Sequence, residues 1–271
     1  LEFRRVLFRS RIVLLTNVPS PYPIYRFIPF DISCFECADH YYANEFSENR
    51  TRIREFDMVF TNTRLLFDEM TKFSPRVRHI SSGYAEELKA SCHKTPKIAK
   101  SVIFSGGISH RIDYRLLDKL VTTLPDHQFF FMGEVYLLKY YIEEERDKRS
   151  LQAWRQLLQR PNVHYLGAFS SEQSTYLLPL FEVGIIPYDV TDLFNYHSHP
   201  VKLYEYLAAG LPVVSTPLPS MLEYVERAPV HIADNAHQMA QVIRGIDFIA
   251  VHFKEKNLQQ VQRILDEQSV A

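Results

Sequence analysis

The stretch that most constrains this fold is residues 198–216, which read as one helix followed directly by one strand. Pro200 suits the first helical position, where its missing N–H group costs nothing, and Ser198 is the best capping residue before it. Gly210 is placed to end the helix with a positive φ angle, and the apolar run 212–216 predicts a short buried strand. A helix leading into a buried strand is typical of α/β folds with a parallel sheet.

Two charged residues of this helix, Lys202 and Glu205, are three positions apart and therefore share a face. A cation in the first turn opposes the helix dipole, so helix stability does not explain the order Lys before Glu. We expect Lys202 and the N–H groups of the first turn to hold an anion, most simply a phosphate. Glu205 has two acceptor oxygens, which suit the two hydroxyls of a ribose. The alternative is a solvated ion pair between the two side chains.

The pattern Pro-x-Lys-x-x-Glu-Tyr-Leu-Ala-x-Gly-x-Pro-Val-Val over 200–214 resembles the donor-site helix of bacterial GT-B glycosyltransferases. It is most similar to the large retaining family that makes cell-surface polysaccharides. The flanks 186–188 and 215–219 also resemble that family, and the similarity is strongest over 101–233. The resemblance implies an α/β fold with two Rossmann-like doubly wound domains, and transfer of a sugar from a nucleoside diphosphate sugar.

Residues 101–250 show strands alternating with helices, as a parallel sheet covered on both faces requires. The predicted strands are 102–105, 128–132, 162–166, 183–187, 212–215 and 229–232. The predicted helices are 112–123, 136–158, 171–180, 200–209 and 218–226. The resemblance makes this segment the nucleotide-sugar donor-binding domain.

Residues 11–85 show the same alternation over a shorter length. The predicted strands are 11–16, 30–36, 57–63 and 77–80, and the predicted helical segments are 50–56 and 64–73. The resemblance makes this the C-terminal part of an acceptor-side Rossmann-like domain whose beginning is missing. We expect 86–100 to be the linker, and 251–271 to be a helix that packs back towards the N-terminal domain.

We expect an unusual origin for the first ten residues, 1–10. With permitted codons they back-translate to CTGGAGTTCAGACGTGTGCTCTTCCGATCT, which resembles a common short-read sequencing adapter. We expect them to be a translated artefact, so the native protein would begin upstream. The alternative is a basic N-terminal arm.

Candidate donor ligands follow the predicted strands. Gly106 and Gly107 would let the backbone approach a diphosphate closely, although a tight turn would also use them. Arg111 lies where the resembled family carries a basic diphosphate ligand; helix capping or a surface role is the alternative. The further candidates for the same pocket, each also explicable by loop packing, are Tyr188, Asn195 and His199.

Candidate catalytic residues come from two places. The resembled family has two glutamates separated by seven residues; Glu205 matches the second, and the first falls on His197. Because the first normally contacts the transferred sugar, the resemblance implies altered donor recognition or stereochemistry here. Asp39 and His40 follow a predicted strand, where a carboxylate or imidazole can position or deprotonate an acceptor hydroxyl. The alternative for them is a polar loop that caps the next helix.

Composition excludes other classes. The formal net charge of -1 gives no case for nucleic-acid binding, and no apolar run approaches the ~18–20 residues of a membrane span. Three cysteines do not make a disulfide framework, and Cys34 and Cys37 are expected to be buried thiols. The segment 135–160 predicts amphipathic helices that cover the sheet, with contact at a membrane surface as the alternative.

The sequence therefore predicts a glycosyltransferase that uses a nucleotide sugar and a glycan or lipid-linked acceptor, with no metal and no cofactor beyond the donor. We expect a cytoplasmic location, at the inner face of the membrane. Two alternatives stay open: a non-catalytic nucleotide-sugar-binding subunit, suggested by His197, and a sugar-nucleotide epimerase on the same architecture.

Overall fold

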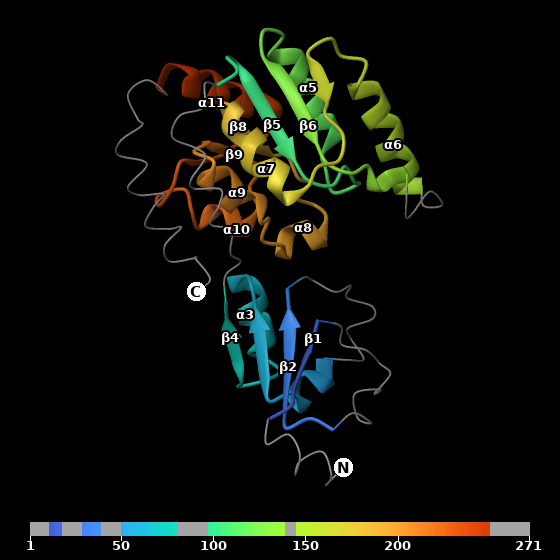
Figure 1. The fold of residues 1–271 in the computed structure, drawn as a ribbon, viewed down its shortest axis with the longest axis vertical. Coiled ribbons are helices and arrows are strands. Elements are labelled where there is room, and N and C mark those ends of the chain that lie inside the picture. Colours follow the sequence, from blue (N-terminus) through green and yellow to red (C-terminus); the bar gives the residue numbers. More distant parts are fainter. Residues whose placement is uncertain (1–10, 18–28, 39–49, 81–96, 139–144, 250–271) are drawn as a thin grey trace. The chain divides into compact units, whose positions relative to one another are not determined.

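The computed structural model describes residues 11–17, 29–38, 50–80, 97–138 and 145–249 (Figure 1). The chain divides into two compact units: one is Leu1–Ser82 with Tyr196–His199, and the other is Gly83–Asn195 with Pro200–Ala271. The parts of the earlier predictions that lie outside the described residues are 1–10, Asp39, His40, most of the linker 86–100, and 251–271.

The first unit contains a four-stranded parallel sheet in the order β1-β2-β3-β4. Its elements are β1 (Val13–Thr16), β2 (Ile32–Cys37), the 3-10 helix η2 (Arg50–Glu55), β3 (Met58–Thr61), α3 (Arg64–Met70) and β4 (Val77–His79). The Thr63 hydroxyl caps α3 by accepting a hydrogen bond from the Leu66 N–H group. Cys34 and Cys37 are buried free thiols on β2. The predicted alternation of strands and helices is confirmed in this unit.

The second unit contains a six-stranded parallel sheet in the order β10-β9-β8-β5-β6-β7. Its strands are β5 (Ser101–Ser105), β6 (Gln128–Met132), β7 (Val163–Tyr165), β8 (Val183–Ile186), β9 (Val213–Ser215) and β10 (Val230–Ile232). All six predicted strands are confirmed, each within one residue at either end. The strand order reverses beside β5, which is where α/β sheets of this kind bind ligands.

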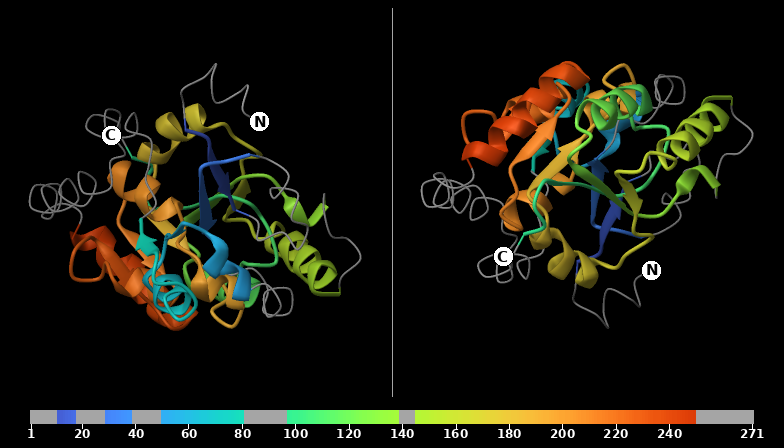
Figure 2. Two further views of the ribbon diagram at one scale, coloured as in Figure 1. Left: turned by 90° about the horizontal axis from the view of Figure 1, so that it is seen from below. Right: turned by 90° about the horizontal axis from the view of Figure 1, so that it is seen from above.

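Helices and helical turns connect these strands. They are α5 (Tyr114–Thr123), η3 (Tyr136–Leu138), α6 (Glu145–Leu157), α7 (Ser171–Leu177), η4 (Leu178–Leu180), α8 (Leu193–His197), α9 (Lys202–Ala208), α10 (Pro219–Leu222) and α11 (Ala236–Ile249). Helix α5 packs against both α6 and α11 (Figures 1 and 2). Of the helix predicted over 136–158, the described residues form a 3-10 turn at Tyr136–Leu138 and an α-helix, α6, from Glu145 to Leu157. Helix α10 is also shorter than predicted, and α8 was not predicted.

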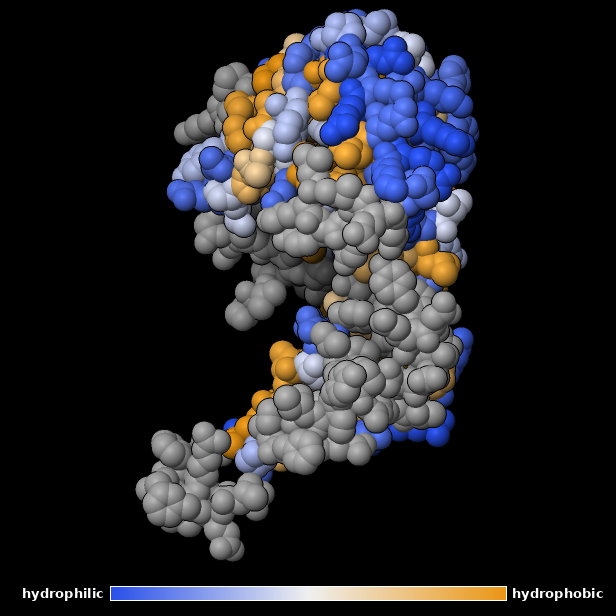
Figure 3. Space-filling view, turned by 90° about the vertical axis from the view of Figure 1, so that its right-hand side faces the viewer, coloured by the Kyte–Doolittle hydropathy of each residue, from blue (hydrophilic) through white to orange (hydrophobic). Residues whose placement is uncertain are grey.

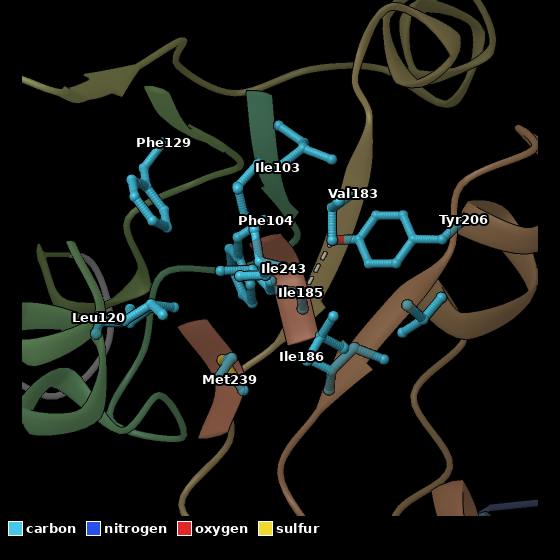
Figure 4. Close-up of a cluster of buried hydrophobic side chains, with 14 of the residues drawn as sticks. Ile103, Phe104, Leu120, Phe129, Val183, Ile185, Ile186, Tyr206, Met239 and Ile243 are labelled. Carbon is cyan, nitrogen blue, oxygen red and sulfur yellow. Dashed lines mark hydrogen bonds between the residues drawn. The ribbon is translucent and has the colours of Figure 1, made fainter. Parts of the chain in front are cut away.

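The core of the second unit explains why its strands read as continuous apolar runs. All four residues of β8 are buried, as are all five of β5. Figure 4 shows side chains of β5, β6 and β8 gathered with residues from α5, α9 and α11. Each fully buried Val, Leu, Ile, Phe or Met side chain contributes roughly 1.5–3 kcal/mol to the stability of the fold. Burial on both faces therefore fixes these strands within the sheet.

Helix α6 covers the sheet with one face. Trp154 and Leu157 are buried in the core, while Glu145, Arg146 and Arg149 lie on its exposed side. The surface on this side of the second unit is largely hydrophilic (Figure 3). The predicted role as a cover for the sheet is therefore confirmed. Within the described ranges, no helix combines the length and apolar character needed to cross a bilayer.

Candidate functional site

Several predicted residues of the second unit meet at the carboxyl edge of its sheet. Gly106 directly follows β5, and Tyr188 follows β8 by two residues. Lys202 begins α9, which leads into β9. Because parallel strands all end at this edge, their loops converge there.

Lys202 is a buried cation at the centre of this group, with only 7% of its surface exposed. Its Nζ donates a hydrogen bond to the Tyr188 hydroxyl at 2.5 Å. The same nitrogen lies 4.1 Å from the Phe104 ring centroid and 4.4 Å from that of Tyr188. The alternative of a solvated ion pair is therefore wrong, because Lys202 is buried against aromatic rings and not paired with Glu205 in solvent.

The environment shifts the proton equilibria of this pair. Burial lowers the pKa of Lys202 below its usual value, although the Tyr188 hydroxyl and the Glu205 carboxylate oppose that shift. Burial alone would raise the pKa of Tyr188, but the nearby charges of Lys202 and Arg111 lower it overall. A cation whose charge is disfavoured by its surroundings would be stabilised by an anion bound beside it.

Gly106 explains how the lysine fits against the backbone. Its φ of +131° is a conformation that glycine adopts readily, and a Cβ there would lie 2.9 Å from Lys202 Nζ. A Cβ at Gly107 would collide with the Tyr136 ring. None of the described residues accepts a hydrogen bond from the Gly107 N–H group. Gly106 therefore brings backbone without a side chain next to the buried ammonium group, and Gly107 lies beside the Tyr136 ring.

Arg111 approaches the same tyrosine. Its guanidinium carbon lies 4.7 Å from the Tyr188 ring centroid and 4.4 Å from that of Phe194. Its Nε donates a hydrogen bond to Asn195 Oδ1 at 2.7 Å. The alternative of helix capping is wrong for this residue, because Asp113 caps α5. Two cations, Arg111 and Lys202, thus share one aromatic ring.

Glu205 lies on α9, one turn after Lys202, and is largely shielded from solvent. Burial raises the pKa of its carboxyl group, and the charge of Lys202 partly opposes this rise. The carboxylate is thus close enough to Lys202 to feel its charge, and its predicted role in holding a ribose stays a prediction.

The start of α9 differs from the sequence prediction. The helix begins at Lys202 instead of Pro200, and no side chain caps it, so the prediction of Ser198 as the cap is wrong. The N–H groups of Leu203 and Tyr204 instead donate to the carbonyls of Pro200 and Val201 in a tight turn. Because those N–H groups are already bonded, the prediction that this turn holds an anion now depends on the lysine side chain. At the other end, Gly210 has the expected positive φ, +72°.

The remaining predicted site residues lie outside the second unit or outside the described residues. His197 ends α8 and His199 follows it, and both belong to the segment Tyr196–His199 that is grouped with the first unit. Asp39 and His40 lie outside the described residues. Their predicted roles in catalysis and donor binding stay predictions.

Two aromatic residues of the site were missed by the sequence analysis. Phe104 lies under the ammonium group of Lys202, and Phe194 lies beside the guanidinium of Arg111. The signal for Phe104 was its place in an apolar strand directly before Gly106. No local pattern indicates Phe194, because its partner is more than eighty positions away.

This arrangement can hold a compact polyanion. It has two side-chain cations, a glycine backbone without a side chain, and aromatic rings packed against the cations. Together these features match the charge and the size of linked phosphate groups. In the described ranges, no cluster of three or more His, Cys, Asp or Glu residues could hold a metal ion.

Comparisons with known proteins identify a family for this chain. Residues 99–246, more than half of the chain, match the family described as "Glycosyl transferases group 1". TuaH of Bacillus subtilis (strain 168), whose name assigns it to teichuronic acid biosynthesis as a glycosyltransferase, is 28% identical over 175 residues. That match covers 58% of this chain and 41% of TuaH, so the chain spans less than half of this relative.

Solved structures share the fold at low sequence identity. A glycosyltransferase from Rickettsia africae ESF-5 has a TM-score of 0.73 at 12% identity, over 98% of this chain and 74% of that one. Anabaena Alr3699/HepE in complex with UDP and glucose has a TM-score of 0.62 at 14% identity, over 97% and 69%. Staphylococcal TarM in complex with fondaparinux, alpha-GlcNAc-glycerol and UDP has a TM-score of 0.68 at 13% identity, over 95% and 52%. The predicted α/β fold of GT-B type is confirmed.

Proposed function

Because this chain belongs to the group 1 glycosyltransferases, we propose that it transfers a sugar from a nucleoside diphosphate sugar to a hydroxyl group. The observation that carries the proposal is the buried ammonium group of Lys202 on the rings of Phe104 and Tyr188. It lies beside the backbone of Gly106, at the sheet edge where such folds bind nucleotides.

In this proposal the cations act on the leaving group. Lys202 and Arg111 stabilise the negative charge that develops on the diphosphate as the bond to the sugar breaks. They need no reorganisation at that moment, because packing against Tyr188 already holds both. Glu205 accepts hydrogen bonds from the ribose hydroxyls. Side-chain cations carry out the charge stabilisation, so we expect no requirement for a metal ion.

The substrates are inferred from chemistry and from relatives. HepE has been solved in complex with UDP and glucose and with UDP-glucose, which favours UDP as the nucleotide of the donor here. The name of TuaH favours a growing polysaccharide or a lipid-linked glycan as acceptor. With such an acceptor, the protein would work in the cytoplasm at the inner face of the membrane, through peripheral contact.

The alternative is a subunit that binds nucleotide sugars without catalysis, and the histidine at position 197 favours it, since the resembled family has a glutamate there.

The test is incubation with UDP-, GDP-, ADP- and TDP-sugars, with measurement of the released nucleoside diphosphate and of transfer to an added acceptor. We expect release with one donor, and a Lys202→Ala variant about 100- to 1000-fold slower, as for removal of one charge-stabilising donor.

The outcomes separate the two functions. Binding of a diphosphate without release from any donor sugar would contradict catalysis and support the non-catalytic subunit. Conversion of the donor into a second nucleotide sugar, without release, would identify an epimerase.

A further inference from the structure

The two central strands of the second sheet, β5 and β8, separate at their carboxyl ends. Their pairing stops at Ile103 and Gly184. On its other side, β5 stays paired with β6 up to Ser105, and β8 stays paired with β9 up to Ile186. A split therefore opens between β5 and β8, at the place where the strand order reverses.

A buried hydroxyl group from α9 bridges this split. The Tyr206 hydroxyl accepts a hydrogen bond from the Ser105 N–H group at 2.7 Å. It donates a longer one, 3.5 Å, to the carbonyl of Ile185 (Figure 4). The side chain of Ser105 does not make this connection, because its buried Oγ has no hydrogen-bond partner among the described residues. Tyr206 thus joins β5 to β8 beyond the end of their own pairing.

Gly184 in β8 makes room for the tyrosine ring. A Cβ at this position would lie 2.4 Å from Tyr206 Cδ2 and 2.6 Å from Cγ. Carbon atoms pack at about 3.5–4.0 Å, so a larger residue at 184 would displace the ring. The tyrosine itself is fully buried, with 0% exposed. Its ring and its hydroxyl are therefore both fixed against the strands.

The same helix carries Lys202 to this split. Lys202 precedes Tyr206 by four residues on α9, so the two side chains share a face of the helix. The ammonium group contacts Phe104 and Gly106 on the β5 side, and the Tyr188 hydroxyl on the β8 side. A shift of α9 along the split would move the tyrosine and the lysine together.

We propose that Tyr206 is a positioning residue, whose hydroxyl fixes α9 at the split so that Lys202 meets the diphosphate of the donor. This role rests on the proposed function. Tyr206 acts through Lys202 and not by touching the ligand. A helix that is held in place before the ligand arrives loses less conformational freedom on binding.

The test is isothermal titration calorimetry on the whole chain. UDP, GDP, ADP and TDP are titrated first, and the tightest binder is then used with Tyr206→Phe. Phenylalanine keeps the ring over Gly184 and removes the hydroxyl that bridges the strands. We expect binding to weaken about tenfold, the scale of one hydrogen bond to a charged group. The melting temperature should also fall, because the buried Ser105 N–H group loses its partner.

Tyr204 provides a matched control on the same helix. It is also fully buried, and its hydroxyl shares a hydrogen bond with that of Tyr224 at 2.7 Å. Neither residue belongs to β5 or β8. Tyr204→Phe should lower the melting temperature and change the dissociation constant of the diphosphate by less than about twofold. If Tyr206 only stabilised the helix, the two variants would behave alike.

Gly184→Ala tests the same placement from the opposite side. This variant keeps the Tyr206 hydroxyl and forces the ring to move, so binding should weaken about as much as in Tyr206→Phe. Combined with Tyr206→Phe, its effect should be smaller than the product of the two single effects, because both changes act through one side chain. If Tyr206→Phe does not fold, Gly184→Ala is compared with Tyr204→Phe instead.

The outcomes separate this role from the proposed function. If the wild-type chain binds none of the four diphosphates, or if Lys202→Ala binds as tightly as the wild type, both proposals are wrong. If the wild type binds and Lys202→Ala weakens binding, the site stands. In that case, affinities of Tyr206→Phe and Gly184→Ala equal to that of Tyr204→Phe would overturn the positioning role alone.

Discussion

Lys202 carries a charge in apolar surroundings, and burial of this charge lowers the stability of the unliganded folded protein. The ammonium group lies on two aromatic rings, and its hydrogen-bond partner is a neutral hydroxyl. Burial lowers its pKa, so the unfolded chain binds this proton more tightly than the folded one. The buried charge therefore lowers the free energy of unfolding. This destabilisation has its full size below the folded-state pKa of Lys202 and disappears as the pH rises to the ordinary pKa of lysine.

This cost predicts opposite effects of Lys202→Met on stability and on binding. Methionine keeps an unbranched chain on the rings of Phe104 and Tyr188 and removes the buried charge. The unliganded variant should melt about 2–4 °C higher near neutral pH, which corresponds to ~1 kcal/mol in a domain of this size. Differential scanning calorimetry with and without a nucleoside diphosphate measures both effects. A variant that melts lower, or that is still stabilised by the ligand, would contradict this account.

The same residue sets the pH dependence of binding. In the proposed function the charged form of Lys202 binds the diphosphate. Burial lowers the pKa of Lys202, so affinity should begin to fall at a lower pH than an ordinary lysine would give. Ionisation of Tyr188, whose pKa is also lowered by the adjacent cations, adds negative charge and acts in the same direction. Titration calorimetry over the alkaline range should show up to about a tenfold loss per pH unit.

A control separates the lysine from the tyrosine. Tyr188→Phe removes the second ionisation and keeps the ring, so the loss of affinity at high pH should persist. Affinity that stays constant up to the ordinary lysine pKa would show that Lys202 does not contact the anion.

The turn after β5 is the element that places the lysine. Gly106→Ala would force a side chain into a φ of +131° and put its Cβ 2.9 Å from Lys202 Nζ. The strain costs roughly 1–2 kcal/mol, and the displaced ammonium group should weaken diphosphate binding by at least tenfold. Melting temperature and calorimetric affinity report the two effects separately.

Gly245 in α11 serves as the comparison, since a Cβ there would meet nothing within 4 Å. Gly245→Ala should stabilise the helix by up to about 1 kcal/mol and leave affinity unchanged. Equal affinities for the two alanine variants would contradict the placement of Lys202 by this turn.

The elements differ in how well the sequence predicted them. Strands β5 and β8 were predictable because both faces are buried, which leaves short apolar runs between turns. The 3-10 turn at Tyr136–Leu138 was not predictable, because the apolar spacing of 136–158 is typical of an α-helix. Helix α8 has five residues and owes its place to Asp192, whose carboxylate accepts hydrogen bonds from the Phe194 and Asn195 N–H groups. The sequence did not indicate this cap, because its hydrogen bonds form only in the folded loop.

The site, like the elements, has residues that the sequence predicted and contacts that it did not. Lys202, Gly106 and Arg111 were predicted from local patterns and from the family resemblance, and the structure brings them together around Tyr188. The bonding of Asn195 to Arg111 was not predictable, because 84 positions separate the two residues. Contacts of that range depend on which strand ends become neighbours, and periodicity carries no information about them.

At the scale of the whole molecule, the donor-side unit is the part that the family match covers. Residues 99–246 contain all six strands β5 to β10 and every residue of the site around Tyr188. The first unit contributes a second parallel sheet, and the fold match to the solved glycosyltransferase from Rickettsia africae covers 98% of this chain. The chain spans 41% of TuaH, so we treat transfer by the whole protein as a proposal and diphosphate binding as its first requirement.

The most direct measurement is therefore thermal denaturation of the chain with UDP, GDP, ADP and TDP, beside a Lys202→Ala, Glu205→Ala double variant. A ligand at about 100 times its dissociation constant adds ~2.7 kcal/mol to the free energy of unfolding. The account predicts a higher melting temperature with one diphosphate, and no such rise in the folded double variant. A folded wild-type chain that none of the four stabilises, or a double variant stabilised as much as the wild type, would contradict the assignment of the site.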